Sequence, residues 1–80
     1  MKYTEVQPMG KYLKRYVKLS AFTMFYVEKV VMYEGSSRER AVFDVKGNAA
    51  DVPCFLGRFE TESEAEKYLA WLVEQAEAEQ

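Results

Sequence analysis

The hydrophobic and polar positions in the last third of the chain follow first the period of a strand and then that of a helix. In residues 54–60 the side chains alternate between two faces, as they do along a strand. This alternation assigns Phe55, Gly57 and Phe59 to one face and Leu56 and Arg58 to the other.

An amphipathic helix is predicted directly after this strand. Thr61, followed three residues later by Glu64, forms a capping-box pattern that marks a helix start. Beyond it, apolar residues recur every three or four positions and define one buried face, formed by Ala65, Leu69, Leu72 and Ala76. The acidic tail, residues 74–80, offers little that can pack, so we expect it to fray.

Two more strands are predicted before residue 50. Residues 21–34 and 38–46 are rich in β-branched and aromatic side chains, and Gly35-Ser36-Ser37 between them is typical of a turn. Residues 2–6 indicate a further short strand. The pattern therefore predicts an α+β fold in one domain, 1–80: an antiparallel sheet of three to four strands, covered on one face by the C-terminal helix.

The segment 9–20 fits two interpretations. On a helical wheel its cations gather opposite its apolar side chains, which favours a second helix. The same residues also alternate as a strand would, with an aromatic and basic face. We favour the helix because it places all four cations together: Lys11, Lys14, Arg15 and Lys18.

Charge is unevenly distributed along the 80 residues, although the net charge is only −2. Residues 1–40 hold eight basic and four acidic side chains, whereas residues 41–80 hold three basic and nine acidic ones. This asymmetry fits self-complementarity, within one molecule or in a homodimer, and it also fits two faces for different partners.

Composition argues against several classes of protein. The chain has no histidine and a single cysteine, and its four glycines do not form a phosphate-binding loop. We therefore expect no enzyme activity, no cofactor and no metal site. No apolar run is long enough to span a bilayer and no secretory leader is visible, so we expect a cytoplasmic protein that does not enter membranes.

Two kinds of binding surface are consistent with the remaining residues. The cations of 11–18, interleaved with Tyr12 and Tyr16, could hold phosphates and stack on bases, although the sequence pI of about 5.1 disfavours a nucleic-acid-binding domain. The chain also has more aromatic side chains than a small core can hide, which favours protein binding or homodimerisation. The candidates are Tyr12, Tyr16, Tyr26, Tyr33 and Trp71.

The second half of the chain resembles a known family in its layout. Residues 26–72 contain MYEGSSRERAVFDVKG and GRFETESEAEKYLAWL, which read as strand, turn, strand, loop, strand and capped helix. This layout is similar to that of small phage-encoded anti-CRISPR proteins that act on type I-F surveillance complexes. A tyrosine-glutamate pair before the turn (Tyr33-Glu34), an acidic residue in the return strand (Asp44) and an aromatic-acidic-small step into the helix (Phe59-Glu60-Thr61) carry the similarity.

The resemblance implies that the protein blocks a host complex by covering its binding surface for target DNA. It would place the contact surface on the outer sheet face and the hairpin, with Tyr33 and Asp44 as contact residues, in the host cytoplasm. The basic N-terminal segment and the acidic tail have no counterpart in that family. From the sequence we thus predict a non-enzymatic protein-binding module, with nucleic-acid binding or homo-oligomerisation as alternatives.

Overall fold

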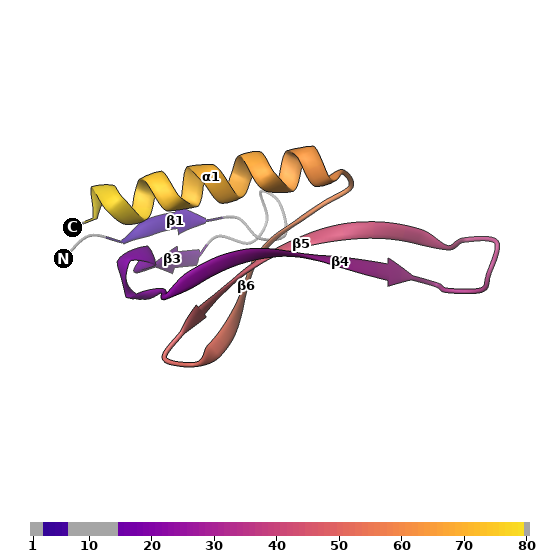
Figure 1. Ribbon diagram of the computed structural model, residues 1–80, viewed down its shortest axis with the longest axis horizontal. Helices are drawn as coiled ribbons and strands as arrows, with labels where there is room; N and C mark the ends of the chain where they lie inside the picture. Colours follow the sequence, from indigo (N-terminus) through magenta and orange to yellow (C-terminus); the bar gives the residue numbers. More distant parts are fainter. Residues whose placement is uncertain (1–2, 7–14, 80) are drawn as a thin grey trace.

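The centre of the fold is a three-stranded antiparallel sheet in the order β4-β5-β6, with one long helix, α1, against one of its faces (Figure 1). This computed structural model describes residues 3–6 and 15–79. The sheet strands are β4 (Met24–Met32), β5 (Arg40–Ala49) and β6 (Val52–Phe59), and the helix is α1 (Glu62–Ala78). The predicted α+β class, with an antiparallel sheet covered on one face by the C-terminal helix, is confirmed.

The core lies between the sheet and α1. Strand side chains alternate between two faces, and those of one face (Val27, Phe43, Val45 and Phe59) pack towards the helix. The helix meets them with the predicted apolar arc, in which Ala65 and Leu72 are buried and Leu69 and Ala76 are partly buried. Thr61 caps the helix as predicted, because its hydroxyl accepts a hydrogen bond from the Glu64 N–H at 3.2 Å.

A second, two-stranded sheet lies beside α1 and corrects the prediction for residues 9–20. It pairs β1 (Thr4–Val6), which confirms the expected N-terminal strand, with β3 (Arg15–Val17) in antiparallel register. Residues 15–17 are therefore a strand and not part of a helix, and a 3-10 turn, η1 (Leu19–Ala21), follows. Residues 9–14 lie outside the described residues. The backbone partners that β1 supplies explain the strand, since the local pattern fitted both structures.

The acidic tail, for which fraying stays a prediction, is helical in most of its described residues. The helix continues to Ala78, and the carboxylate of Glu79 accepts three hydrogen bonds from outside α1. The donors are the Thr4 hydroxyl at 2.7 Å and the backbone N–H groups of Leu19 and Ser20 at 3.1 Å each. A tail with few apolar residues is thus held by hydrogen bonds to β1 and η1.

A bulge in β6 reverses the predicted faces of two residues. Val45 pairs with Gly57 and Lys46 with Phe55, so Leu56 is the extra residue between them. Leu56 is buried in the core, and Phe55 shares the opposite face with Lys46. Strict alternation had assigned Phe55 to the face of Gly57 and Phe59, which is wrong.

Two hairpins join the sheet strands. The loop between β5 and β6 is only Ala50 and Asp51, both with positive φ (51° and 65°), as in the tight turns whose twist matches that of the flanking strands. The β4–β5 hairpin is the longer one, and it extends well past the N-terminal end of α1 (Figure 1).

Among the helices formed by residues of the described ranges, none is long and apolar enough to cross a membrane.

Candidate protein-binding surface

The tip of the β4–β5 hairpin presents an aromatic side chain to solvent. Tyr33 directly follows β4, and 61% of it is exposed. Its φ of 56° lies in the left-handed region, which a bulky side chain rarely adopts and which costs about 1–3 kcal/mol. Val31, two residues earlier, is also exposed. The sequence candidate Tyr33 is therefore accessible and held at a fixed position.

A set of hydrogen bonds holds the tip in this conformation. The carbonyl of Tyr33 accepts from both the N–H and the hydroxyl of Ser36, at 3.1 and 2.7 Å. The Ser36 hydroxyl oxygen in turn accepts from the Arg38 N–H at 3.1 Å. Across the turn, the Glu39 carboxylate accepts from the Gly35 N–H at 3.0 Å. These bonds connect the residues of the turn and satisfy the backbone groups around the positive φ of Tyr33.

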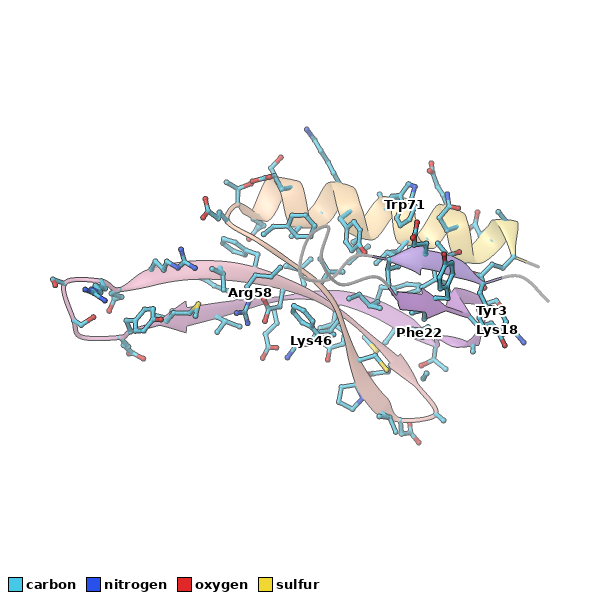
Figure 2. All side chains as sticks on the ribbon, turned by 180° about the vertical axis from the view of Figure 1, so that it is seen from behind. Tyr3, Lys18, Phe22, Lys46, Arg58 and Trp71 are labelled. Atoms are coloured by element: carbon cyan, nitrogen blue, oxygen red, sulfur yellow. The ribbon has the colours of Figure 1, made fainter. Side chains whose placement is uncertain are left out.

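The face of the three-stranded sheet turned away from α1 is here called the outer sheet face. Register places on it Tyr26, Glu28, Val30, Arg40, Val42, Asp44, Lys46, Phe55 and Arg58. Within this face Val42 and Asp44 are almost fully buried, whereas Glu28 and Arg40 are exposed. Figure 2 shows Arg58 and Lys46 on this side of the sheet, whereas Trp71 lies on the helix.

Two ion pairs lie side by side on the outer sheet face. Arg58 donates two hydrogen bonds to Asp44, from Nε to Oδ1 at 2.7 Å and from a terminal nitrogen to Oδ2 at 3.0 Å. The guanidinium also lies 5.7 Å from the centre of the Phe55 ring. Glu28, the register partner of Asp44 on β4, forms the second ion pair diagonally across the strands with Lys46. The hydrogen bond to Asp44 raises the pKa of Arg58, and the hydrogen bond to Glu28 raises the pKa of Lys46.

Asp44, the second residue singled out by resemblance, is not itself open to a partner. Only 3% of it is exposed, because Arg58 covers its carboxylate. Arg58 is the accessible member of the pair, with 41% of its side chain exposed. Removing the Asp44 carboxylate would deprive Arg58 of the acceptor of both hydrogen bonds. Asp44 thus positions Arg58 on the outer sheet face.

Trp71 lies on the other side of the molecule, at an aromatic pocket. Its ring stacks on Tyr68 at 5.7 Å, and Tyr68 contacts Phe59 at 5.1 Å. Together with Glu5 and Val6 of β1, these rings line a pocket of about 320 Å³. The Tyr68 hydroxyl donates to the Leu56 carbonyl at 2.9 Å, which fixes the middle ring, and burial raises the pKa of Tyr68. The sequence had named Trp71 as a candidate but had missed Glu5, Phe59 and Tyr68, whose pattern is that of ordinary strand and core residues.

The remaining sequence candidates belong to the N-terminal segment. Tyr16 is 70% exposed on β3, where it is the register partner of Glu5. Lys18 is partly buried near the end of β1 (Figure 2). Of the others, Arg15 is described only as part of the backbone of β3, and Lys11, Tyr12 and Lys14 lie outside the described residues. The structure therefore brings Tyr16 close to the pocket through Glu5, and separates it from Tyr33 and Asp44.

The described part of the chain holds no group of three or more Cys, Asp or Glu side chains placed to bind a metal ion. No model of a protein family matches the chain, and the searches of curated proteins and of solved structures found no significant match. The resemblance to anti-CRISPR proteins therefore stays a prediction.

Proposed function

We propose that the chain is a non-enzymatic protein-binding module that contacts its partner through the hairpin tip and the outer sheet face. The observation that carries this proposal is the conformation of Tyr33. A bulky residue at positive φ, exposed at the end of a hairpin beyond the core, contributes nothing to the packing of the fold. Backbone strain of this kind is concentrated at functional sites, where the surrounding structure maintains it.

The tip has the properties of an interface hot spot. Tyrosine is enriched among hot-spot residues, since it combines a large apolar ring with a hydroxyl. The hydrogen bonds at the turn hold the ring's attachment point before binding, which lowers the entropy lost on association. Further along the same strands, at the level of Glu28 and Tyr26 of β4, Arg58 and Lys46 offer two cations, each of which pairs with a neighbouring carboxylate. Such a surface suits a partner with mixed polar and aromatic contacts.

A sharper version of the proposal makes the chain a phage or mobile-element inhibitor that acts in the host cytoplasm. It would occlude a host assembly such as a type I-F CRISPR surveillance complex. Support comes from the resemblance over residues 26–72 and from the exposure of Tyr33 on the hairpin that the resemblance implicates. Asp44 would contribute through Arg58.

The binding proposal is tested with Tyr33→Ala and, as a matched control, Val73→Ala, which removes an exposed apolar side chain from α1. Each tagged variant is incubated with host lysate, and the retained proteins are quantified. We expect one stoichiometric partner, stable at moderate salt, that Val73→Ala retains and Tyr33→Ala loses while both variants keep the wild-type melting temperature. Equal retention by the two variants would refute the role of the tip. Asp44→Arg is unsuitable because it would remove the acceptor of both Arg58 hydrogen bonds and place a like charge beside Arg58, which could disturb the fold itself.

The inhibitor version is tested separately with a purified type I-F surveillance complex and a labelled target duplex. Addition of the wild-type chain should abolish the shift of the duplex in a gel, and Tyr33→Ala should restore it. A duplex that is bound equally well with and without the chain would rule out this complex as the target and leave the general proposal standing.

A further inference from the structure

The strand β4 forms one edge of the three-stranded sheet. Among the described residues β4 pairs with β5 alone, and this register runs without a shift over all nine residues of the strand. None of the nine is buried. Such an edge carries a row of outward backbone N–H and C=O groups whose regular spacing matches that of another extended strand. We propose that β4 pairs with β4 of a second copy of this chain, so that the two three-stranded sheets join into one.

The opposite edge of the sheet, formed by β6, is protected against such pairing. Pro53 has no backbone N–H to donate, and the bulge at Leu56 interrupts the regular spacing of the strand. β4 contains neither proline nor glycine and has no bulge. Native proteins commonly protect or cover their sheet edges. The β4 edge is therefore the one at which a further strand is expected, and pairing there uses this edge of both copies, which closes the assembly as a dimer.

The sequence of β4 fits its own reverse. A two-fold axis perpendicular to the sheet at Glu28, the middle residue of β4, makes the two strands antiparallel and keeps their corresponding faces on the same side. Apolar side chains then oppose one another at both ends of the pairing: Met24 with Met32, Phe25 with Val31 and Tyr26 with Val30. Directly opposed aromatic and β-branched side chains stabilise antiparallel strands. A second copy thus supplies matching side chains as well as backbone groups.

The charged centre of β4 favours this register over its neighbours. At the axis Glu28 meets Glu28 of the second copy, and each carboxylate already forms an ion pair with Lys46 of its own sheet. A shift by two residues in one direction would place Lys29 opposite Lys29, which forms none of the ion pairs among the described residues. A shift in the other direction would place Glu28 opposite Tyr26. The centred register avoids both arrangements.

Pairing also covers an apolar side chain that is open in the single chain. Val31 is 44% exposed, and alternation along β4 places it on the same face as Val27, which packs towards α1. In the dimer Val31 lies opposite Phe25 of the second copy, which packs against the core of that copy. Tyr33 follows β4 and lies outside the paired residues, so the dimer presents two hairpin tips and does not depend on the function proposed above.

Disulfide cross-linking tests the register directly. Cys54→Ser removes the only cysteine, and single cysteines are introduced into this background and oxidised with diamide. Directly opposed residues of antiparallel strands have Cα atoms about 4.5–5.5 Å apart, which a disulfide can span. We expect Glu28→Cys to form covalent dimers by itself. Met24→Cys and Met32→Cys, each about 26 Å from its own copy at about 3.3 Å per residue, should form them only when the two variants are mixed.

Sedimentation equilibrium measures the dimer without a cross-link. The mass of the full chain should rise with concentration to twice that of one chain. Val31→Glu should raise the dissociation constant about ten-fold or more, because it places a carboxylate opposite the partly buried Phe25. Val52→Glu, which changes an exposed valine of β6 in the same way, should leave it unchanged. Tyr33→Ala should also leave it unchanged, so failure at the edge is distinguishable from failure at the hairpin tip.

Several results would overturn the proposal. One is the mass of a single chain at every concentration, and another is an equal effect of Val31→Glu and Val52→Glu. Cross-linking of Met24→Cys alone as fast as that of Glu28→Cys would indicate random encounters. A dimer that is cross-linked neither by Glu28→Cys nor by the mixture of Met24→Cys and Met32→Cys would place the contact on another surface.

Discussion

Glu79 provides the sharpest test of how the C-terminal end of α1 is held against β1 and η1. Its carboxylate connects the end of α1 to β1 and to η1, through the Thr4 hydroxyl and the backbone N–H groups of Leu19 and Ser20. Glu79→Gln keeps the size of the side chain and removes the charge. The amide can present only one oxygen, and its NH₂ group then faces a donor.

The expected cost follows from these contacts. Oε2 accepts from Thr4 and Leu19, and Oε1 accepts from Ser20. If the amide oxygen takes the position of Oε2, the bond from Ser20 is lost and the other two weaken with the charge. A hydrogen bond to a charged group contributes about 1.5–3 kcal/mol when shielded and less when partly exposed. We therefore expect Glu79→Gln to lower the free energy of unfolding by about 1–2 kcal/mol at neutral pH.

The pH dependence of this difference has a defined sign. Burial alone would raise the pKa of Glu79, but the hydrogen bonds from Thr4, Ser20 and Leu19 outweigh it and lower the pKa from its usual 4.5. A carboxyl group whose pKa is lower in the folded state adds stability above its unfolded pKa. The difference in free energy of unfolding between wild type and Glu79→Gln should be constant above about pH 5. It should disappear as the pH falls through the pKa of Glu79 in the folded state, which lies below 4.5.

The measurement is urea unfolding followed by circular dichroism at several pH values. Glu77→Gln serves as the control, because Glu77 is an exposed residue of the same helix end, and it should change stability by less than about 0.5 kcal/mol. Equal unfolding curves for the two variants would refute the role assigned to Glu79. A cost that persists unchanged at low pH would show that the charge of Glu79 is not its origin.

The remaining predictions concern the sheet. Replacing Ala50-Asp51 by Asn-Gly should relieve the backbone strain at the two residues with positive φ and stabilise the fold by about 1 kcal/mol. The melting temperature should then rise by about 4–8 °C. An unchanged melting temperature would contradict the strain assigned to this turn. Gly47→Ala should cost about 1–3 kcal/mol in urea unfolding, since the added Cβ would lie 2.3 Å from Cδ2 of Phe22. The destabilisation caused by Gly47→Ala should be smaller when Phe22 has also been replaced by alanine. If the effects of the two substitutions simply add, the Phe22 ring is not the cause of the destabilisation.

The candidate site could be predicted only in part. The turn residues after Tyr33 indicated the hairpin, so the exposure of this tyrosine could be predicted from the sequence. Asp44 was placed on the correct face, but its burial depends on Arg58, which reaches it across the β5–β6 ladder. The pocket was not predictable, because Phe59 and Tyr68 have the spacing of core residues and Glu5 that of a solvent-facing strand residue. Their meeting requires β1 to lie beside α1.

What the sequence determined by itself is local. The cap at Thr61, the buried arc of α1 and the β4–β5 hairpin all follow from residues only a few positions apart, whose backbone bonds and periodicity are satisfied within one element. The tertiary structure decided the rest. Residues 15–17 form a strand because they pair with β1, and Leu56 is buried in the core because of the bulge in β6. Glu79 accepts hydrogen bonds from residues that are distant in the sequence. In each case the local pattern allowed more than one structure, and distant hydrogen-bond partners selected one.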